Sequence, residues 1–177
     1  DIRNSITRND FLIYMAKNSP AGNYPRYFSE QASYWTITGV NDDVKEALIN
    51  EDGMVEVDKA LFSIEPMIKI GDSLYNWSNV KSTQSLGFPE NEGEFDFLPT
   101  VTWQCSDLKF ITGVTSNGEA NKNSILDISY KFENHSEKPL DFEFYLLIRP
   151  FQVNPYYQFL NLTGGVGKIN SVNAENG

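Results

Sequence analysis

The hydrophobic pattern of the chain changes its period after about residue 33. Before that point, residues 8–20 (RNDFLIYMAKNSP) have the spacing of an amphipathic helix. Its apolar face holds Phe11, Tyr14 and Met15. Asn9 or Asp10 is a suitable N-cap, and Pro20 ends the segment. From Tyr34 onward apolar and polar residues tend to alternate, so the pattern predicts one short helix followed by β-strands.

Two segments have the turns and the alternation of β-hairpins. Residues 44–57 could also be helical, because Val44, Ala47 and Leu48 have helical spacing. The central Glu-Asp-Gly turn and the alternation after it favour a hairpin. Residues 62–77 are the clearer case, because a Gly-Asp pair separates two alternating runs. Within this hairpin Pro66 is expected at an edge or a bulge, since proline cannot donate a backbone hydrogen bond.

A polar stretch separates these hairpins from the next strands. Residues 78–96 are rich in Gly, Asn and Glu and predict a long loop. Its carboxylates could offer oxygen atoms to a hard cation, but their spacing matches no calcium loop, so a solvated loop is favoured. These carboxylates are Glu90, Glu92, Glu94 and Asp96. Residues 98–104 and 108–116 then have the pattern of strands.

The clearest alternation lies near the carboxyl end. Residues 124–134 alternate regularly, and a His-Ser-Glu-Lys-Pro turn leads into residues 140–151. We expect these two segments to pair as antiparallel neighbours. The run Tyr145–Ile148 is continuously apolar, which is typical of a strand that is covered on both faces.

Together these elements predict an all-β fold, an antiparallel β-sandwich with a short N-terminal helix. The pattern divides the chain into a helical flank (residues 1–33), a sandwich domain (34–170) and a tail (171–177). The tail has little apolar content, so we expect it to fray.

Composition narrows the classes of function. A net charge of −10, with 14 scattered Lys and Arg residues, argues against a nucleic-acid partner. No apolar run reaches the roughly 20 residues of a membrane helix, so no membrane insertion is expected. The one cysteine, Cys105, and the one histidine, His135, provide neither a disulfide framework nor a metal cluster. We expect Cys105 to be half-buried, His135 to be solvated in a turn, and the chain to use no cofactor or metal.

Two kinds of carbohydrate chemistry can be compared with the sequence. Hydrolysis needs two carboxyl groups about 5 Å or about 6.5–9.5 Å apart. The candidate acids show no spacing that marks such a pair, so no catalytic residue is assigned. They are Glu46, Glu51, Asp52, Glu56, Asp58 and Glu65.

Recognition of a sugar or of another domain needs aromatic rings with amides at their rim. Residues 149–161 supply that mixture. The candidate contact residues are Arg149, Gln152, Asn154, Tyr156, Tyr157, Gln158 and Asn161. In the alternative reading, the tyrosines cover a sheet edge or an interdomain face while Phe151, Val153 and Phe159 pack inward.

Three stretches resemble one protein family. They are residues 14–40 (YMAKNSPAGNYPRYFSEQASYWTITGV), 46–66 (EALINEDGMVEVDKALFSIEP) and 148–169 (IRPFQVNPYYQFLNLTGGVGKI). They resemble the β super-sandwich region of large bacterial proteins with discoidin (coagulation-factor-type) domains and a six-hairpin-glycosidase-like barrel. The resemblance implies a galactose-mutarotase-like super-sandwich, a larger parent protein, polysaccharide processing, and a secreted or cell-envelope location.

The resemblance and the contact block together favour one hypothesis. The chain would be a non-catalytic β-sandwich module of a glycoside-hydrolase-like enzyme, docking on the catalytic barrel and helping to shape its substrate cleft. Its partners would be that barrel or a polysaccharide. Two alternatives stay open: an autonomous carbohydrate-binding module, which predicts an exposed tryptophan among Trp35, Trp77 and Trp103, and a structural or adhesive surface domain.

Overall fold

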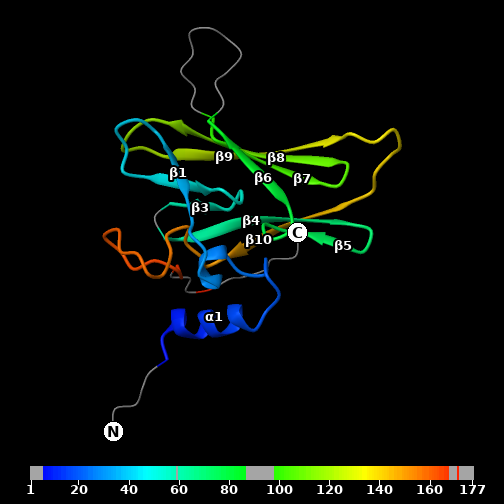
Figure 1. Ribbon diagram of the computed structural model, residues 1–177. Coiled ribbons are helices and arrows are strands. Elements are labelled where there is room, and N and C mark those ends of the chain that lie inside the picture. Colours follow the sequence, from blue (N-terminus) through cyan, green and yellow to red (C-terminus); the bar gives the residue numbers. More distant parts are fainter. Residues whose placement is uncertain (1–5, 59, 87–97, 168–170, 172–177) are drawn as a thin grey trace.

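The computed structural model describes residues 6–58, 60–86, 98–167 and 171 (Figure 1). One helix, α1 (Arg8–Lys17), and a short 3-10 helix, η1 (Arg26–Ser29), precede the strands. The first sheet, sheet A, contains β1 (Trp35–Gly39), β2 (Glu46–Asn50), β3 (Val55–Val57), β4 (Phe62–Ile70), β5 (Ser73–Tyr75) and β10 (Glu143–Arg149). The second sheet, sheet B, contains β6 (Lys81–Ser85), β7 (Thr100–Cys105), β8 (Leu108–Gly118) and β9 (Ser124–Asn134).

The two sheets form an antiparallel sandwich, as the sequence predicts. Sheet A has the order β1-β2-β3-β4-β10, with β5 also paired to β4, and sheet B has the order β6-β7-β8-β9. Both predicted hairpins are confirmed, because β2 pairs with β3 and β4 pairs with β5. Within the described residues, no helix is long and apolar enough to cross a membrane.

The predicted helix is confirmed, but its predicted apolar face is wrong: Phe11 and Tyr14 are exposed, whereas Leu12, Ile13 and Ala16 pack inward. Its N-cap is Thr7 rather than Asn9 or Asp10. The Thr7 hydroxyl accepts a hydrogen bond from the Asp10 backbone N–H at 3.1 Å. In return, the Asp10 carboxylate accepts one from the Thr7 backbone N–H at 3.0 Å. This reciprocal capping box satisfies two N–H groups that an uncapped helix would leave unpaired. Asp10 therefore acts from the third helical position.

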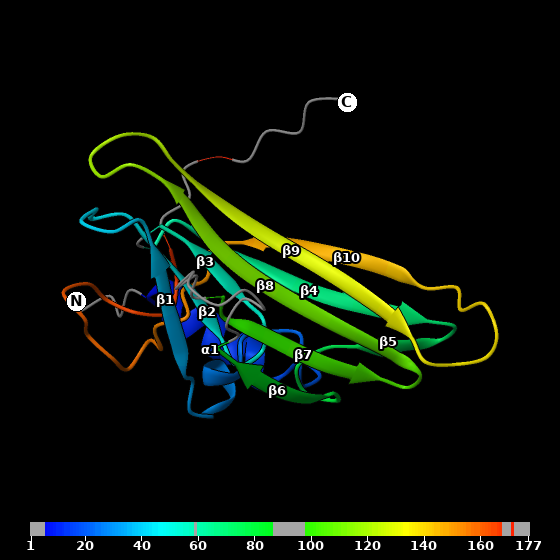
Figure 2. The ribbon, with the colours of Figure 1, turned by 90° about the horizontal axis from the view of Figure 1, so that it is seen from above.

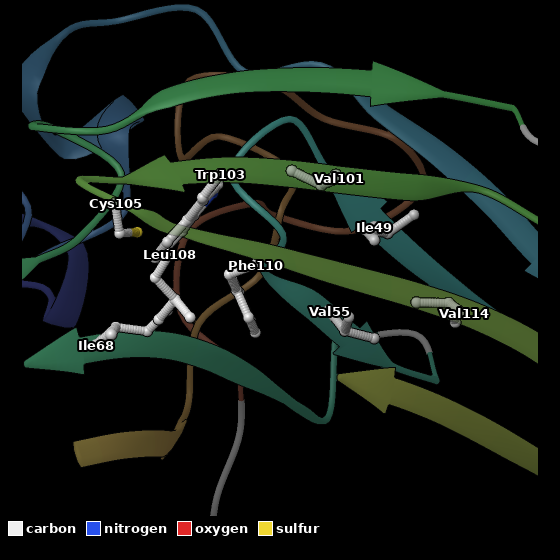
Figure 3. Close-up of a cluster of buried hydrophobic side chains, with 9 residues drawn as sticks. All are labelled: Ile49, Val55, Ile68, Val101, Trp103, Cys105, Leu108, Phe110 and Val114. Atoms are coloured by element: carbon white, nitrogen blue, oxygen red, sulfur yellow. The ribbon is translucent and has the colours of Figure 1, made fainter. Parts of the chain in front are cut away.

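The core lies between the two sheets. Its buried residues come from both sheets and are Ile49, Val55, Ile68, Val101, Trp103, Cys105, Leu108, Phe110 and Val114 (Figure 3). The rings of Trp103 and Phe110 meet edge to face at 5.4 Å, an arrangement that aromatic quadrupoles favour. Cys105 is fully buried rather than half-buried, and burial raises the pKa of its thiol to about 11.

A second layer packs on the other face of sheet A. It contains α1, η1 and residues 150–167, which lie below sheet A in Figure 1. The buried side chains here are Ala16, Tyr27, Phe28, Met54, Phe151 and Val153. The helical flank is therefore a packed part of the structure, and this layer covers part of the outer face of sheet A.

The prediction that residues 124–134 and 140–151 are paired neighbours is wrong. β9 pairs with β8 in sheet B, whereas β10 pairs with β4 in sheet A. The connection between them crosses from one sheet to the other, so that their apolar faces meet in the core. The ring of Phe132 lies 4.8 Å from that of Phe142 and 5.0 Å from that of Phe144. The alternation predicts which face of each strand is apolar. That face is buried equally well when the two strands lie in facing sheets and when they pair in one hairpin.

Three further local expectations can be compared with the structure. β6 lies inside the stretch that was predicted to be a loop. The pattern does not indicate this strand, because an exposed polar edge strand has no hydrophobic period. Residues 87–97 of that loop, which include Glu90, Glu92, Glu94 and Asp96, lie outside the described residues.

Pro66 lies on a local edge, as predicted: on one side of β4, β3 pairs with residues 62–64 and β5 with residues 68–70. The run Tyr145–Ile148 is not covered on both faces, since β10 is an edge strand with exposed apolar side chains.

Candidate functional site

Arg149, at the end of β10, ties sheet A to the second layer. Its guanidinium binds both carboxylate oxygens of Glu65, with 3.0 Å between Nε and Oε1. A third guanidinium N–H donates to the backbone carbonyl of Asn23. The guanidinium carbon lies 4.8 Å from the ring centre of Phe151, within the range of a cation–π contact. The Glu65 side chain is 9% exposed, so this is a nearly buried, bidentate ion pair.

Arg26, in η1, makes a similar connection to the turn between β2 and β3. Its Nε donates to Asp52 Oδ2 at 2.8 Å, and its Nη1 lies 3.4 Å from Glu51 Oε1. Its guanidinium also lies 5.3 Å from the ring centre of Trp77. Burial raises the pKa of Asp52, and the ion pair with Arg26 opposes that shift. Burial likewise raises the pKa of Glu51, against the hydrogen bond from the Tyr34 backbone.

Glu56, in β3, holds the loop of residues 150–167 in place. One carboxylate oxygen accepts the backbone N–H of Val153 at 2.7 Å, and the other accepts that of Ala60 at 2.7 Å. Burial raises the pKa of Glu56, and these two hydrogen bonds partly offset the effect. Tyr27 holds the same loop from η1, because its hydroxyl donates to the carbonyl of Gln152 and lies 3.1 Å from that of Gly165.

The buried carboxylates are engaged by the chain itself. Glu65 binds Arg149, Asp52 binds Arg26, and Glu56 binds two backbone N–H groups. The cavity beside Asp52 and Glu65 measures about 20 Å³, roughly the room for one water molecule. Among the described residues, no group of three or more His, Cys, Asp or Glu side chains could hold a metal ion. These carboxylates therefore form a structural network.

The structure divides the predicted contact residues into an inner and an outer group. Arg149 is half-buried in its ion pair, and Gln152 and Asn154 are buried. The Gln152 amide donates to the Thr163 carbonyl at 2.8 Å, so it shapes the loop from inside. Tyr156 is half-buried and its ring stacks on Phe28 at 5.8 Å. Arg149, Gln152 and Tyr156 therefore stabilise the loop, whereas the buried side-chain amide of Asn154 has no hydrogen-bond partner among the described residues.

The outer group consists of Tyr157, Gln158 and Asn161, which are all exposed. Tyr157 touches the flank, because its hydroxyl lies 3.3 Å from the Gln31 carbonyl oxygen, and its ring meets that of Tyr156 edge to face. Phe159 and Leu160 lie exposed between them along the chain. The tip of the loop therefore presents aromatic, amide and apolar groups to solvent, and its role in contact stays a prediction.

An apolar groove lies where α1 meets the start and end of this loop. It has a volume of about 520 Å³ and is lined mainly by Ile6, Phe11, Leu12, Pro150 and Val166. Ile6 is 77% exposed and Phe11 is 55% exposed. A hydrogen bond from the Asn9 side chain to the Gly164 carbonyl, at 3.1 Å, holds the helix against the loop. We call this surface the α1 groove.

Aromatic rings also line a concavity of about 310 Å³ between the β1 and β6 edges of the two sheets. Tyr34 and Trp35 lie on one side of it and Gln84 and Thr100 on the other. Tyr34 is largely exposed, whereas Trp35 and Trp77 are half-buried and Trp103 is buried. None of the three tryptophans is thus exposed as the binding-module alternative predicts.

The buried ion network was missed by the sequence analysis. In the sequence, its acids lie on or beside hairpins without a distinguishing pattern; they are Glu51, Asp52, Glu56 and Glu65. One signal could have found two of them: Glu56 and Glu65 interrupt strongly apolar strands at positions that the sheet must cover. Arg26 and Arg149 carry no such signal, because their partners are distant in the sequence.

Comparison with known proteins adds no family to this description. The chain matches no protein-family model, no curated protein and no solved structure.

Proposed function

We propose that the chain is a non-catalytic β-sandwich module of a carbohydrate-active enzyme, and that it docks on the catalytic domain of that enzyme through the α1 groove. The observation that carries the proposal is the groove itself. It exposes Ile6 and Phe11 beside Pro150 and Val166, at the junction of the second layer with β10. Exposed apolar surface that is gathered in a concavity is typical of an interaction site.

The segments that line the groove are held in place in the free chain. Asn9 holds α1 to Gly164, and Glu56 holds Val153 in the loop. The Arg149 ion pair stands next to Pro150, where the loop begins. A surface that is already ordered loses little side-chain and loop entropy on binding. The inner contact residues therefore support docking indirectly, by shaping the loop.

The catalytic step is assigned to the partner because the buried acids of this chain are engaged. Glu65, Asp52 and Glu56 each bind an internal donor. The carbohydrate context of the proposal rests on the resemblance to the super-sandwich region of glycosidase-like proteins. In that context the exposed loop tip, with Tyr157 and Gln158, would lie beside the interface and contribute to the rim of the substrate cleft.

A Phe11→Glu variant tests the docking surface. Burial of a phenylalanine contributes roughly 1.5–3 kcal/mol, so its loss should weaken binding to the separately produced catalytic barrel at least about tenfold. Isothermal titration calorimetry measures this directly. Phe11 is exposed in the free chain, so the melting temperature should stay close to that of the wild type.

The matched control is Ile125→Glu, which introduces the same charge at an equally exposed apolar position on β9. This variant should bind the barrel as the wild type does. Equal affinity of the wild type and Phe11→Glu for the barrel, or no binding by any form, would refute the proposed function.

The concavity beside Tyr34 favours a second candidate, direct carbohydrate binding. Tyr34 could stack on the apolar face of a sugar, and Gln84 and Thr100 could bind its hydroxyl groups. Titration with soluble polysaccharides should then change the fluorescence of Trp35, and Tyr34→Ala should abolish that change. Calorimetric silence of the wild type at millimolar glycan would exclude this candidate while leaving the docking proposal intact.

A further inference from the structure

β10 is an unusually apolar edge strand. Among the described residues, the edge strands include β1 and β10 in sheet A and β6 and β9 in sheet B. Natural proteins protect such edges with charged residues, proline, bulges or short strands, because the free backbone groups can pair with another strand. β6 begins with Lys81, and β9 carries Asp127 and Lys131 among its exposed residues. Both edges are thus protected.

β10 lacks this protection over most of its length. Residues 144–148 are Phe-Tyr-Leu-Leu-Ile, five apolar residues in succession. Tyr145 is 41% exposed, Leu146 is 45% exposed and Ile148 is 68% exposed. In Figure 2, β9 and β10 lie along the same side of the sandwich, with β10 forming the border of sheet A.

The backbone of β10 has groups available for a further strand. In antiparallel ladders, residues alternate between hydrogen-bonded and non-hydrogen-bonded pairs. Leu146 stands opposite Pro66, which has no N–H to donate, so this pair fits the non-hydrogen-bonded position. The N–H and C=O of Leu146 are then directed away from β4. By alternation, those of residues 144 and 148 are directed to the same free edge.

We propose that β10 pairs with β10 of a second copy of this chain, antiparallel and across a two-fold axis at Leu146. Such an axis places each Leu146 opposite its counterpart, Phe144 opposite Ile148, and Tyr145 opposite Leu147. The two strands then overlap over their full length and form about six backbone hydrogen bonds. A two-fold axis is the commonest symmetry of homo-oligomers, because one self-complementary patch serves both copies.

The charges at the two ends of β10 agree with this register. The strand begins with Glu143 and ends with Arg149, so each Glu143 stands opposite Arg149 of the second copy. Opposite charges across a strand pair are favourable. Glu143 already binds Lys69 of its own chain at 2.9 Å, and Arg149 binds Glu65. Across the joined sheets Lys69 and Glu143 would be followed by Arg149 of the second copy, whose own partner Glu65 lies diagonally from it, opposite Leu147.

The expected dimer is concentration-dependent. One pair of short strands buries less than the roughly 800 Å² per partner of a standard stable interface. We therefore expect dissociation at low micromolar concentration and association at higher concentration. The inference goes beyond the proposed function and uses a different surface: Phe11→Glu should leave the dimer intact, and a change at Leu146 should leave docking on the barrel intact.

Cysteine cross-linking tests the register. In a hydrogen-bonded pair the two Cα atoms lie about 5.5 Å apart, within the range of a disulfide. Leu146→Cys should therefore form a disulfide-linked dimer under mild oxidation. Ile148→Cys is the matched control, since its counterpart lies four residues along the strand, about 13 Å away. The wild type should not cross-link, because Cys105 is buried. Equal cross-linking of the two variants would overturn the register.

Charge substitution at the axis tests the symmetry. Sedimentation equilibrium of the wild type should show species of twice the monomer mass of 20.1 kDa as concentration rises. Leu146→Arg and Leu146→Glu should each be monomeric, because like charges meet at the axis. An equimolar mixture of the two should dimerise again. A wild-type chain that stays monomeric up to about 500 μM, far above the micromolar association expected here, or a mixture that fails to associate, would overturn the proposal.

Discussion

The Arg149–Glu65 ion pair leads to the sharpest prediction about stability. Arg149→Met keeps the length and much of the apolar surface of the side chain but removes the charge. It leaves Glu65, whose side chain is 9% exposed, without its partner, and it leaves the Asn23 carbonyl without a donor. The Glu65 hydroxyl donor, Ser63, remains at 2.8 Å, so the carboxylate keeps one hydrogen bond.

The expected loss is large compared with the stability of a domain. Removal of one partner from a buried pair costs about 3–5 kcal/mol, because an uncompensated charge stays in the interior. Domains of this size have unfolding free energies of about 5–15 kcal/mol. Arg149→Met should therefore shift the urea midpoint strongly. An exposed pair gives the contrast: Lys69→Met removes a bridge to Glu143 and should cost no more than about 1 kcal/mol.

The double variant Arg149→Met/Glu65→Leu separates charge burial from packing. It removes both charges and leaves apolar groups of similar length, so most of the lost stability should return. Urea unfolding followed by far-UV circular dichroism at pH 7 measures all four proteins. The reasoning would be refuted if Arg149→Met cost less than about 1 kcal/mol, since an almost buried carboxylate cannot lose its partner so cheaply. It would also be refuted if the double variant were as unstable as the single one.

Two further predictions concern the loop of residues 150–167. Burial raises the pKa of Glu56 above its ordinary value of 4.5, so the folded chain binds this proton more tightly than the unfolded chain does. The resulting stabilisation is complete below pH 4.5 and is lost as the pH rises through the folded pKa. Glu56→Gln should therefore make the unfolding free energy depend less steeply on pH above pH 4.5. Urea titrations at several pH values measure this dependence, and an unchanged slope would contradict the prediction. A Cβ atom on Gly164 would lie 2.0 Å from the Pro155 carbonyl oxygen, so Gly164→Ala should cost about 1–3 kcal/mol and speed hydrogen exchange in the loop. Gly71→Ala is the control, because a Cβ atom there meets no other atom and only the positive φ of +57° disfavours alanine. Equal hydrogen exchange in the loop of both variants would argue against the clash at Gly164.

The strands could largely be predicted from the sequence, because alternation reports directly which side chains a sheet must cover. β9 shows this best: its alternating residues 124–134 form one strand with the predicted bounds. Its partner could not be predicted in the same way. Alternation fixes the buried face of β9 and β10, but the choice between one hairpin and two facing sheets depends on β8 and β4, which lie far away in the sequence.

The candidate site was harder to predict than the fold. Residue type alone made Arg149, Gln152 and Asn154 look like contact residues, because polar side chains are usually exposed. The burial of Arg149 depends on Glu65, which no local pattern connects with residue 149. The α1 groove was missed for a related reason: the spacing of Phe11 and Tyr14 predicts the packed face of the helix, but both are exposed and Leu12, Ile13 and Ala16 pack instead. A periodic pattern of apolar residues does not reveal hydrogen bonds and ion pairs between side chains that are distant in the sequence.

The loop of residues 150–167 shows why these buried polar groups matter for recognition. It has two isolated bridges, Phe151 to Val166 and Phe159 to Thr163, and no regular strand among its described residues. Ordering each residue of such a loop costs about 1–2 kcal/mol of backbone entropy. Side chains of sheet A and of η1 offset that cost, since Glu56 and Tyr27 form hydrogen bonds with the loop backbone. The loop is therefore ordered in the free chain, and its exposed tip can bind a partner without that entropy being lost on contact.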